Sequence, residues 1–205
     1  FITLEGPEGA GKTTQAHLLA ERLRAQGHRV VLTREPGGDP LAEGIRALLQ
    51  NAELALAPRA ELLLFLAARA QHVAHVIRPA LESGQIVLCD RFSDSTVAYQ
   101  SYGAGLPRET VVSLIDFATG GLEPHLTLLL DVDVTVGLQR QGEWGRMEQR
   151  GVAFHQRVRE GFLAQARAHP ERIRVIDASQ PPEAVARQID AAVAAVVAAP
   201  ANPVV

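Results

Sequence analysis

Short, mostly apolar runs alternate along this chain with longer stretches in which apolar residues recur at helical spacing. The runs are β-prone and cover residues 1–4, 30–33, 86–89, 126–130 and 174–176. Unbroken apolar runs are typical of strands that are buried on both faces. The stretches between them predict helices at about 14–26, 41–49, 58–83, 95–119, 134–140, 152–169 and 182–198.

Regular alternation of strands and helices predicts an α/β fold, because parallel strands need crossover connections that cover the sheet. We expect one domain over residues 1–205, with a five-stranded parallel sheet between two helical layers, a three-layer α/β/α arrangement. Gly103, Gly105 and Pro107 predict a break in the helix at 95–119. Residues 199–205 are expected to form a tail after the last helix.

The loop after the first strand carries the clearest chemical signal. It satisfies the pattern G-x-x-x-x-G-K-[ST] between a predicted strand and a predicted helix, as a phosphate-binding loop (P-loop) requires. Lys12 is the only lysine among twenty basic residues. Its compact ammonium suits phosphate oxygens as a point charge. The predicted P-loop consists of Gly6, Pro7, Glu8, Gly9, Ala10, Gly11, Lys12, Thr13 and Thr14.

These residues predict a P-loop NTPase whose ligand is a nucleoside triphosphate with Mg²⁺. Backbone N–H groups of residues 9–13 are expected to surround the phosphates, and the Thr13 hydroxyl is expected to bind Mg²⁺. Asp90 and Arg91 follow the third strand and should therefore reach the same edge of the sheet. Asp90 can hold Mg²⁺ through water, and Arg91 can bridge donor and acceptor phosphates.

Residues 140–150 are rich in arginine and contain glycines that permit movement. Two interpretations are open: an exposed connection between helices, or a mobile lid that closes over the triphosphate. Phosphoryl transfer depends mainly on positioning and charge neutralisation, so several arginines near the phosphates are meaningful. If the acceptor is itself a phosphate, its oxygen is already anionic and no strong general base is required.

Composition narrows the classes of partner. A net charge of −3, with arginines scattered among acidic residues, does not indicate a nucleic-acid partner. We identify no apolar stretch as a membrane span and expect no membrane partner. Cys89 is the only cysteine and lies in a predicted strand, where a buried thiol is expected. These features favour a cytoplasmic location.

Four motifs, in order along the chain, resemble those of bacterial thymidylate kinases. They are the P-loop followed by Gln15, the segment TREPGG at 33–38, the segment FLAAR at 65–69, and the segment from Asp90 to Gln100. The resemblance extends from residue 1 to about residue 178. It implies the nucleoside monophosphate kinase fold and Mg²⁺-assisted transfer of the γ-phosphoryl group of ATP to dTMP, which gives dTDP for dTTP synthesis. It also implies a homodimer built from helices near the third and fourth strands.

The resemblance assigns roles to individual residues. It implies that Lys12, Arg91 and Arg146 are catalytic cations and that Glu8 is a P-loop carboxylate near the acceptor sugar. Arg146 is the lid arginine expected to stabilise the γ-phosphate. Thr13 and Asp90 correspond to the Mg²⁺ site.

The same resemblance implies an acceptor site for dTMP. Phe65 matches an aromatic residue that stacks on thymine, and Tyr99 matches a ring that disfavours a 2′-hydroxyl. Thymine presents an N3–H donor and an O4 acceptor, which an amide and a guanidinium can meet. The remaining residues implied for this site are Glu35, Pro36, Arg46, Arg69, Arg91, Thr96 and Gln100.

Two positions depart from the pattern of the family. Gly145 precedes Arg146 where family lids commonly carry aspartate, and Ala104 stands where an arginine is expected. Residues near Arg140 or Arg150 are candidates to compensate.

Three alternative functions stay open. A kinase for another nucleoside monophosphate would differ only in the acceptor pocket. A nucleotide-dependent switch of the GTPase kind would carry N-K-x-D, which cannot occur because Lys12 is the only lysine. A P-loop kinase for a sugar or another metabolite would not depend on a monophosphate.

Overall fold

The computed structural model describes residues 1–140, 146 and 148–197. Its strands are β1 (Ile2–Glu5), β2 (Val30–Arg34), β3 (Ile86–Asp90), β4 (Leu126–Asp131) and β5 (Ile173–Asp177). They form one parallel sheet in the order β2-β3-β1-β4-β5. Because β1 is central, the loop that follows it emerges between the carboxyl ends of β3 and β4.

Helical segments connect these strands and follow the last one. Three of the segments depart from α-helical geometry: η1 and η2 are π-helical, and η3 is a 3₁₀ turn. The segments are α1 (Lys12–Ala25), α2 (Pro40–Gln50), α3 (Pro58–His72), η1 (Val73–Ile77), α4 (Arg78–Glu82), α5 (Ser93–Thr96), η2 (Val97–Gly103), α6 (Arg108–Thr119), α7 (Val134–Gln139), η3 (Glu148–Arg150), α8 (Val152–Ala168) and α9 (Pro182–Val197).

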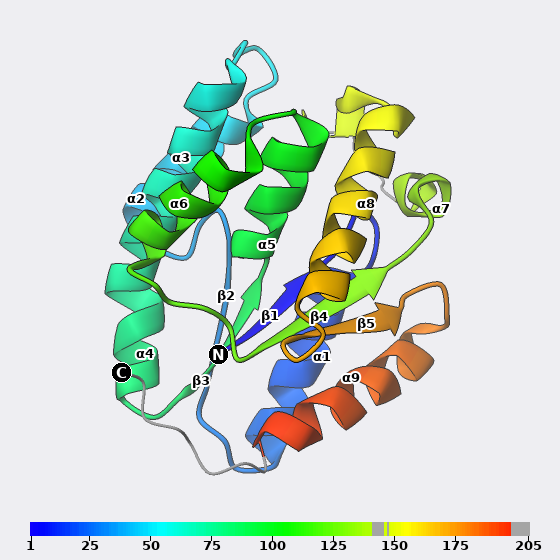
Figure 1. Cartoon of the computed structure of the whole chain (residues 1–205). Coiled ribbons are helices and arrows are strands. Elements are labelled where there is room, and N and C mark those ends of the chain that lie inside the picture. Colours follow the sequence, from blue (N-terminus) through cyan, green and yellow to red (C-terminus); the bar gives the residue numbers. More distant parts are fainter. Residues whose placement is uncertain (141–145, 147, 198–205) are drawn as a thin grey trace.

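Helices cover both faces of the sheet (Figure 1). On one face, Leu4 of the central strand packs in a cluster with Leu19 of α1 and Ile189 of α9. On the other face, Ile77 of η1 packs over β3. Phe162 of α8 belongs to a further cluster that covers β4 and β5. The three inner strands β1, β3 and β4 are therefore buried on both sides, which explains their continuous apolar runs.

The structure confirms the predicted α/β fold with a five-stranded parallel sheet. The break near Gly103 is confirmed, because η2 ends there and α6 begins at Arg108. The helix expected at 58–83 is a continuous succession of α3, η1 and α4. The predicted lid at 140–150 falls largely on residues 141–145 and 147, outside the described part, and so does the predicted tail at 199–205.

The sequence predicted no membrane span, but one helical stretch is a candidate for one. The succession Pro58–Glu82 is long and apolar enough to cross a membrane, judged by length and composition only. Core helices pass the same test. Glu61, Arg69 and His72 of this stretch are buried and make polar contacts with other elements, as in a helix that packs within a protein core.

Candidate active site

The P-loop joins β1 to α1 and depends on two glycines that lie against backbone. Gly6 has a φ of 139°, and a Cβ there would clash with the carbonyl oxygen of Leu130. Gly9 has a φ of 68°, and its Cβ would clash with the carbonyl of Gly137. Only glycine combines these conformations with such close approach. The loop therefore leads tightly into α1, whose N-terminus carries a partial positive charge.

Lys12 lies inside the loop to which it belongs. Its Nζ donates hydrogen bonds to the carbonyl oxygens of Gly6 at 3.1 Å and Pro7 at 2.8 Å, and the side chain is buried. Burial and then the positive charge of Arg91 lower the pKa of Lys12 to about 8, although Glu8 opposes them. The ammonium is thus held at the site where phosphates are expected.

Thr13 and Asp90 come together from α1 and β3. The Thr13 hydroxyl donates to Asp90 Oδ2 at 2.5 Å. A hydroxyl and a carboxylate are oxygen ligands, which a hard cation such as Mg²⁺ prefers. Across residues 1–140, 146 and 148–197, no group of three or more His, Cys, Asp or Glu side chains could hold a metal ion. A cation at Thr13 and Asp90 would therefore take its other ligands from phosphate oxygens and water.

Arg91 adopts a backbone conformation that is uncommon for a residue with a side chain. Its φ of 70° lies in the left-handed region, which costs free energy outside glycine. Its guanidinium donates to Glu8 Oε2 at 2.7 Å, to Ser95 Oγ at 3.2 Å and to the Tyr99 hydroxyl at 3.3 Å. These contacts fix the cation in front of the P-loop.

Glu8 completes this cluster. The Tyr99 hydroxyl donates to Glu8 Oε1 at 2.7 Å, while Arg91 binds the other oxygen. Burial raises the pKa of Glu8, but Arg91, Lys12 and Tyr99 together lower it more, to about 2. Glu8 is therefore an ionised carboxylate at neutral pH.

Glu5, which sequence reasoning missed, lies fully buried behind Arg91. Its Oε1 accepts the backbone N–H groups of Phe92 at 2.7 Å and Ser95 at 3.2 Å, and its Oε2 accepts the Ser95 hydroxyl at 2.5 Å. Burial, followed by the charge of Asp94, raises the pKa of Glu5 to about 7. Glu5 thus orders the turn that carries Arg91.

Two pockets meet at the cluster of Glu8 and Arg91. The phosphate pocket, of about 800 Å³, is lined by P-loop residues 8–14, by Asp90 and Arg140, and by residues 178–182 after β5. The second pocket, of about 390 Å³, lies beside it. Glu8, Glu35, Arg46 and Arg91 line both pockets. The structure therefore places a small cavity directly beside the P-loop cavity, joined by charged side chains.

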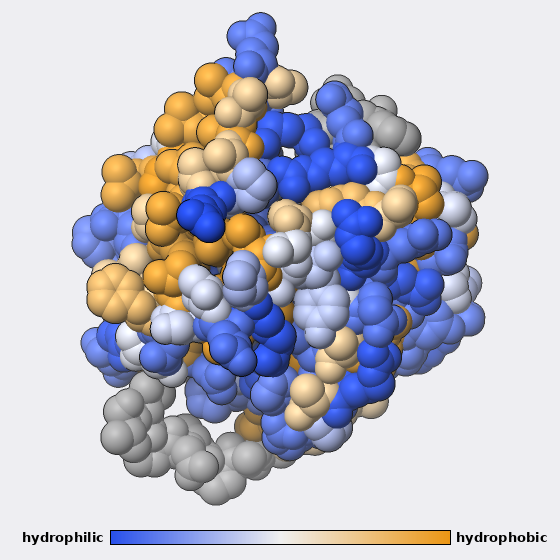
Figure 2. Space-filling model, turned by 45° about the horizontal axis from the view of Figure 1, so that its top comes forward, coloured by the Kyte–Doolittle hydropathy of each residue, from blue (hydrophilic) through white to orange (hydrophobic). Residues whose placement is uncertain are grey.

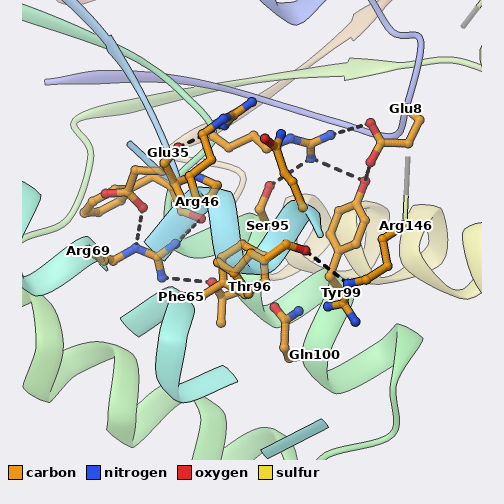
Figure 3. A pocket seen from close by; sticks show the side chains of 15 residues that line it. Glu8, Glu35, Arg46, Phe65, Arg69, Ser95, Thr96, Tyr99, Gln100 and Arg146 are labelled. Carbon is orange, nitrogen blue, oxygen red and sulfur yellow. Dashed lines mark hydrogen bonds and ion pairs between the residues drawn. The ribbon is translucent and has the colours of Figure 1, made fainter. Parts of the chain in front are cut away.

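Every residue predicted for the acceptor site lines the second pocket (Figure 3). Arg69 donates to Glu35 Oε2 at 2.7 Å and to Thr96 Oγ1 at 2.9 Å. Phe65 lines this pocket and is only partly buried, whereas Phe92, which also lines it, is fully buried. The lining residues from the prediction are Glu8, Glu35, Pro36, Arg46, Phe65, Arg69, Arg91, Thr96, Tyr99 and Gln100.

The arginines of the predicted lid lie in different places. Arg146 lines the second pocket, where it donates to Leu49 O at 3.0 Å and to Glu61 Oε2. Arg150 donates to the same oxygen of Glu61, at 2.5 Å. Arg140 lines the phosphate pocket. In the described arrangement Arg146 thus pairs with Glu61 in the second pocket and does not line the phosphate pocket.

Besides the buried Glu5, sequence reasoning missed several residues that line the two pockets. Residues 178–182 follow the carboxyl end of β5, so the rule that ligands bind at this edge could have found them. Ser95 also lines the second pocket, but nothing in the sequence singles it out within the segment that follows Arg91. Leu49 and Gln50 end α2 and reach the second pocket only because α2 packs along it.

A parallel sheet with a P-loop after its central strand, together with a second pocket that shares charged residues with the phosphate pocket, defines a P-loop phosphotransferase. The family model described as thymidylate kinase matches residues 4–189. Since this match covers most of the sequence, the chain belongs to the thymidylate kinase family.

Individual relatives agree with this membership. The chain is 56% identical to the thymidylate kinase of Desulfovibrio desulfuricans over 95% of both sequences. It is 57% identical to that of Pseudomonas fluorescens over 93% of this chain and 92% of the relative. Among solved structures, the thymidylate kinase of Ehrlichia chaffeensis superposes with a TM-score of 0.77 at 40% identity, over 93% of this chain and 97% of the other.

Proposed function

We propose that the two pockets divide the reaction of this family between them. The chain is a kinase that phosphorylates dTMP to dTDP with ATP. In our proposal the phosphate pocket binds the triphosphate of ATP and the second pocket binds dTMP. The observation that carries this assignment is that Arg91, Glu8 and Arg46 line both pockets.

This assignment defines the roles of the two nucleotides in the transfer. An oxygen of the dTMP phosphate attacks the γ-phosphorus of ATP, the bond to the β-phosphate oxygen breaks, and ADP leaves. Lys12 and the N–H groups of the P-loop neutralise charge on the donor. Arg91 stands between the pockets, where it can contact both the attacking and the transferred phosphate. The acceptor phosphate is anionic already, so the chain needs no general base.

Mg²⁺ fits the donor side of this site. The Thr13 hydroxyl and the Asp90 carboxylate lie within hydrogen-bond distance of each other in the phosphate pocket. Together they would hold the cation directly and through water. When bound, Mg²⁺ neutralises charge on the transferred phosphoryl group.

The second pocket supports a pyrimidine nucleotide as acceptor. Phe65 offers a partly exposed aromatic face, and Gln100 and Arg69 offer an amide and a guanidinium. Tyr99, held by Glu8, would occupy the space beside the sugar and disfavour a 2′-hydroxyl. Base stacking and hydrogen bonds of this kind distinguish nucleotides of similar size.

We further propose that the protein is a homodimer and acts in the cytoplasm. The face formed by α3 and α6 exposes apolar side chains: Phe117 is 87% exposed, Leu63 56% and Val112 40%. Figure 2 shows apolar residues gathered over this side of the molecule. A second copy packed there would remove them from water. Sedimentation of wild-type protein and of Phe117→Glu tests this: a wild-type monomer would contradict it.

The acceptor is tested by ADP formation from Mg²⁺-ATP with dTMP, dUMP, AMP, CMP, GMP or no acceptor. We expect turnover to favour dTMP strongly. Preference for another monophosphate would leave the donor site intact and overturn the assignment of the second pocket. Hydrolysis independent of any acceptor would instead favour a switch protein.

A further inference from the structure

Glu61 is a buried carboxylate to which the reaction described above gives no role. It lies in the first turn of α3 with 0% relative exposure. Its Oε1 accepts a hydrogen bond from Gln100 Nε2 at 3.0 Å, and its Oε2 accepts from Arg146 and Arg150. One oxygen of Glu61 therefore contacts Gln100, which lines the second pocket, and the other oxygen contacts two guanidinium groups.

The two arginines make such a charge tolerable in the protein interior. A buried carboxylate is costly unless cations and hydrogen bonds compensate it. Arg150 is itself held, with its guanidinium carbon 4.9 Å from the centre of the Phe154 ring. Glu61 is thus supplied with cations at Oε2, which leaves Oε1 available as an acceptor for Gln100.

This contact fixes which end of the Gln100 amide turns toward the pocket. An ionised carboxylate accepts hydrogen bonds and donates none, so it binds the NH₂ end of the amide and repels the oxygen end. With Nε2 committed to Glu61, the amide oxygen is the end left for a ligand. Gln100 lines the second pocket beside Thr96 and Phe65 (Figure 3).

We propose that Glu61 is a positioning residue that makes the pocket select pyrimidines carrying a hydrogen on N3. The oxygen of an amide held in this way accepts the N3–H of thymine or uracil. Cytosine presents a lone pair at N3, which would face the amide oxygen and be repelled. This inference rests on the proposed assignment of the second pocket to the acceptor base.

The test is Glu61→Gln, measured as kcat/KM for dTMP, dUMP and dCMP. Glutamine can donate or accept, so the Gln100 amide becomes free to turn. We expect the dTMP to dCMP ratio to fall about tenfold, the scale of one hydrogen bond to a charged group. The dTMP to dUMP ratio should stay unchanged, because both bases carry N3–H. General damage to the pocket would instead change both ratios, and that result would overturn the inference.

Arg150→Gln is the matched control. It removes one guanidinium from Oε2 and leaves the contact between Oε1 and Gln100 in place. The dTMP to dCMP ratio should be retained in this variant. If Arg150→Gln lowered the ratio as much as Glu61→Gln, orientation of Gln100 by Glu61 would not be the cause.

Gln100→Ala separates failure of this inference from failure of the pocket assignment. If Gln100→Ala leaves the dTMP to dCMP ratio unchanged, the base does not bind beside Gln100 and both proposals fail. If Gln100→Ala lowers the ratio but Glu61→Gln does not, only the role of Glu61 fails. In the double variant, Glu61→Gln should have no further effect on the ratio, because it acts through Gln100.

A measurement without a variant at Glu61 covers the case in which Glu61→Gln does not fold. Side-chain NH₂ signals of ¹⁵N-labelled wild-type protein are assigned with Gln100→Ala. We expect the Gln100 protons to be protected from exchange with water, since they face a buried carboxylate. Rapid exchange of both protons would overturn the inference.

Discussion

The hydroxyl of Tyr99 donates a hydrogen bond to Glu8 Oε1 at 2.7 Å and thereby links the second pocket to the P-loop. Glu8 belongs to the loop that precedes α1, whereas Tyr99 belongs to η2, so the bond joins segments 91 positions apart. The ring of Tyr99 is held at one end by this bond and along one side by Phe162, at 6.1 Å between ring centres. A ring held in this way cannot easily move aside for a sugar that carries a 2′-hydroxyl.

Tyr99→Ala should therefore relax the exclusion of ribonucleotides. We expect the ratio of kcat/KM for dTMP to that for ribothymidine monophosphate to fall about tenfold, because the steric barrier to the 2′-hydroxyl is lost. Tyr99→Phe keeps the ring and loses only the hydrogen bonds of the hydroxyl to Glu8 and Arg91, so it should retain most of the discrimination. An unchanged ratio in Tyr99→Ala would reject this role.

Lys12→Ala should abolish turnover, with a loss of at least about 10³-fold in kcat. The reason is that Lys12 is the cation held within the P-loop itself. Lys12→Arg is the control for charge: its planar guanidinium does not fit the space of an ammonium, so it should also be severely impaired. Equilibrium binding of dTMP should persist in both variants, and substantial turnover in Lys12→Ala would contradict the P-loop mechanism.

Arg146→Ala should lower kcat about 100-fold and change the dissociation constant of dTMP by less than about threefold. This expectation follows from the predicted contact with the γ-phosphate, which develops fully in the transition state. In the described position, however, Arg146 lines the second pocket and pairs with Glu61. Steady-state kinetics and a titration of dTMP binding decide between a role at the γ-phosphate and a role at the acceptor. Losses of equal size in kcat and in dTMP affinity would assign Arg146 to the acceptor.

Glu5 should make stability depend on pH between about 4.5 and 7. Its pKa is raised from 4.5 to about 7 in the folded protein, chiefly by burial. In this range the folded state binds more protons than the unfolded state, so the free energy of unfolding falls as pH rises. Glu5→Gln, which resembles the protonated carboxyl, should flatten this dependence.

Denaturant unfolding at pH 5, 6 and 7 measures the effect. Wild-type protein should lose about 1–3 kcal/mol relative to Glu5→Gln over this interval. Glu21→Gln alters an exposed glutamate of α1 and serves as the matched control. Parallel curves for wild-type protein and Glu5→Gln would show that Glu5 does not titrate in this range.

The fold could be predicted from the sequence, and the P-loop recognised in it, because both depend on local signals. A P-loop is contiguous, and the apolar runs of β1, β3 and β4 report burial on both faces directly. Phe65 could not be assigned from periodicity alone, since core packing would produce the same helical spacing. Its partial exposure toward the pocket separates the two interpretations.

Buried carboxylates were harder to find. Glu61 resembles an ordinary acidic residue in the first turn of a helix, and its partners Gln100, Arg146 and Arg150 lie 39, 85 and 89 positions away. Glu5 precedes the P-loop and belongs to no part of the motif. The carboxyl-edge rule predicts which loops meet. Only the packing of η2 against α8, and the hydrogen bond that joins Gln100 of η2 to Glu61 of α3, show which side chains touch.

The single lysine of this protein allows its donor site to be modified selectively. Lys12 is the only lysine in the sequence, and a pKa of about 8 leaves a larger share of it neutral and nucleophilic near pH 7.5 than an ordinary lysine has. An amine-directed acylating reagent therefore has one lysine to modify, and it is the one that ATP would cover. The rate of that modification would report donor-site occupancy directly, without labels or engineered residues.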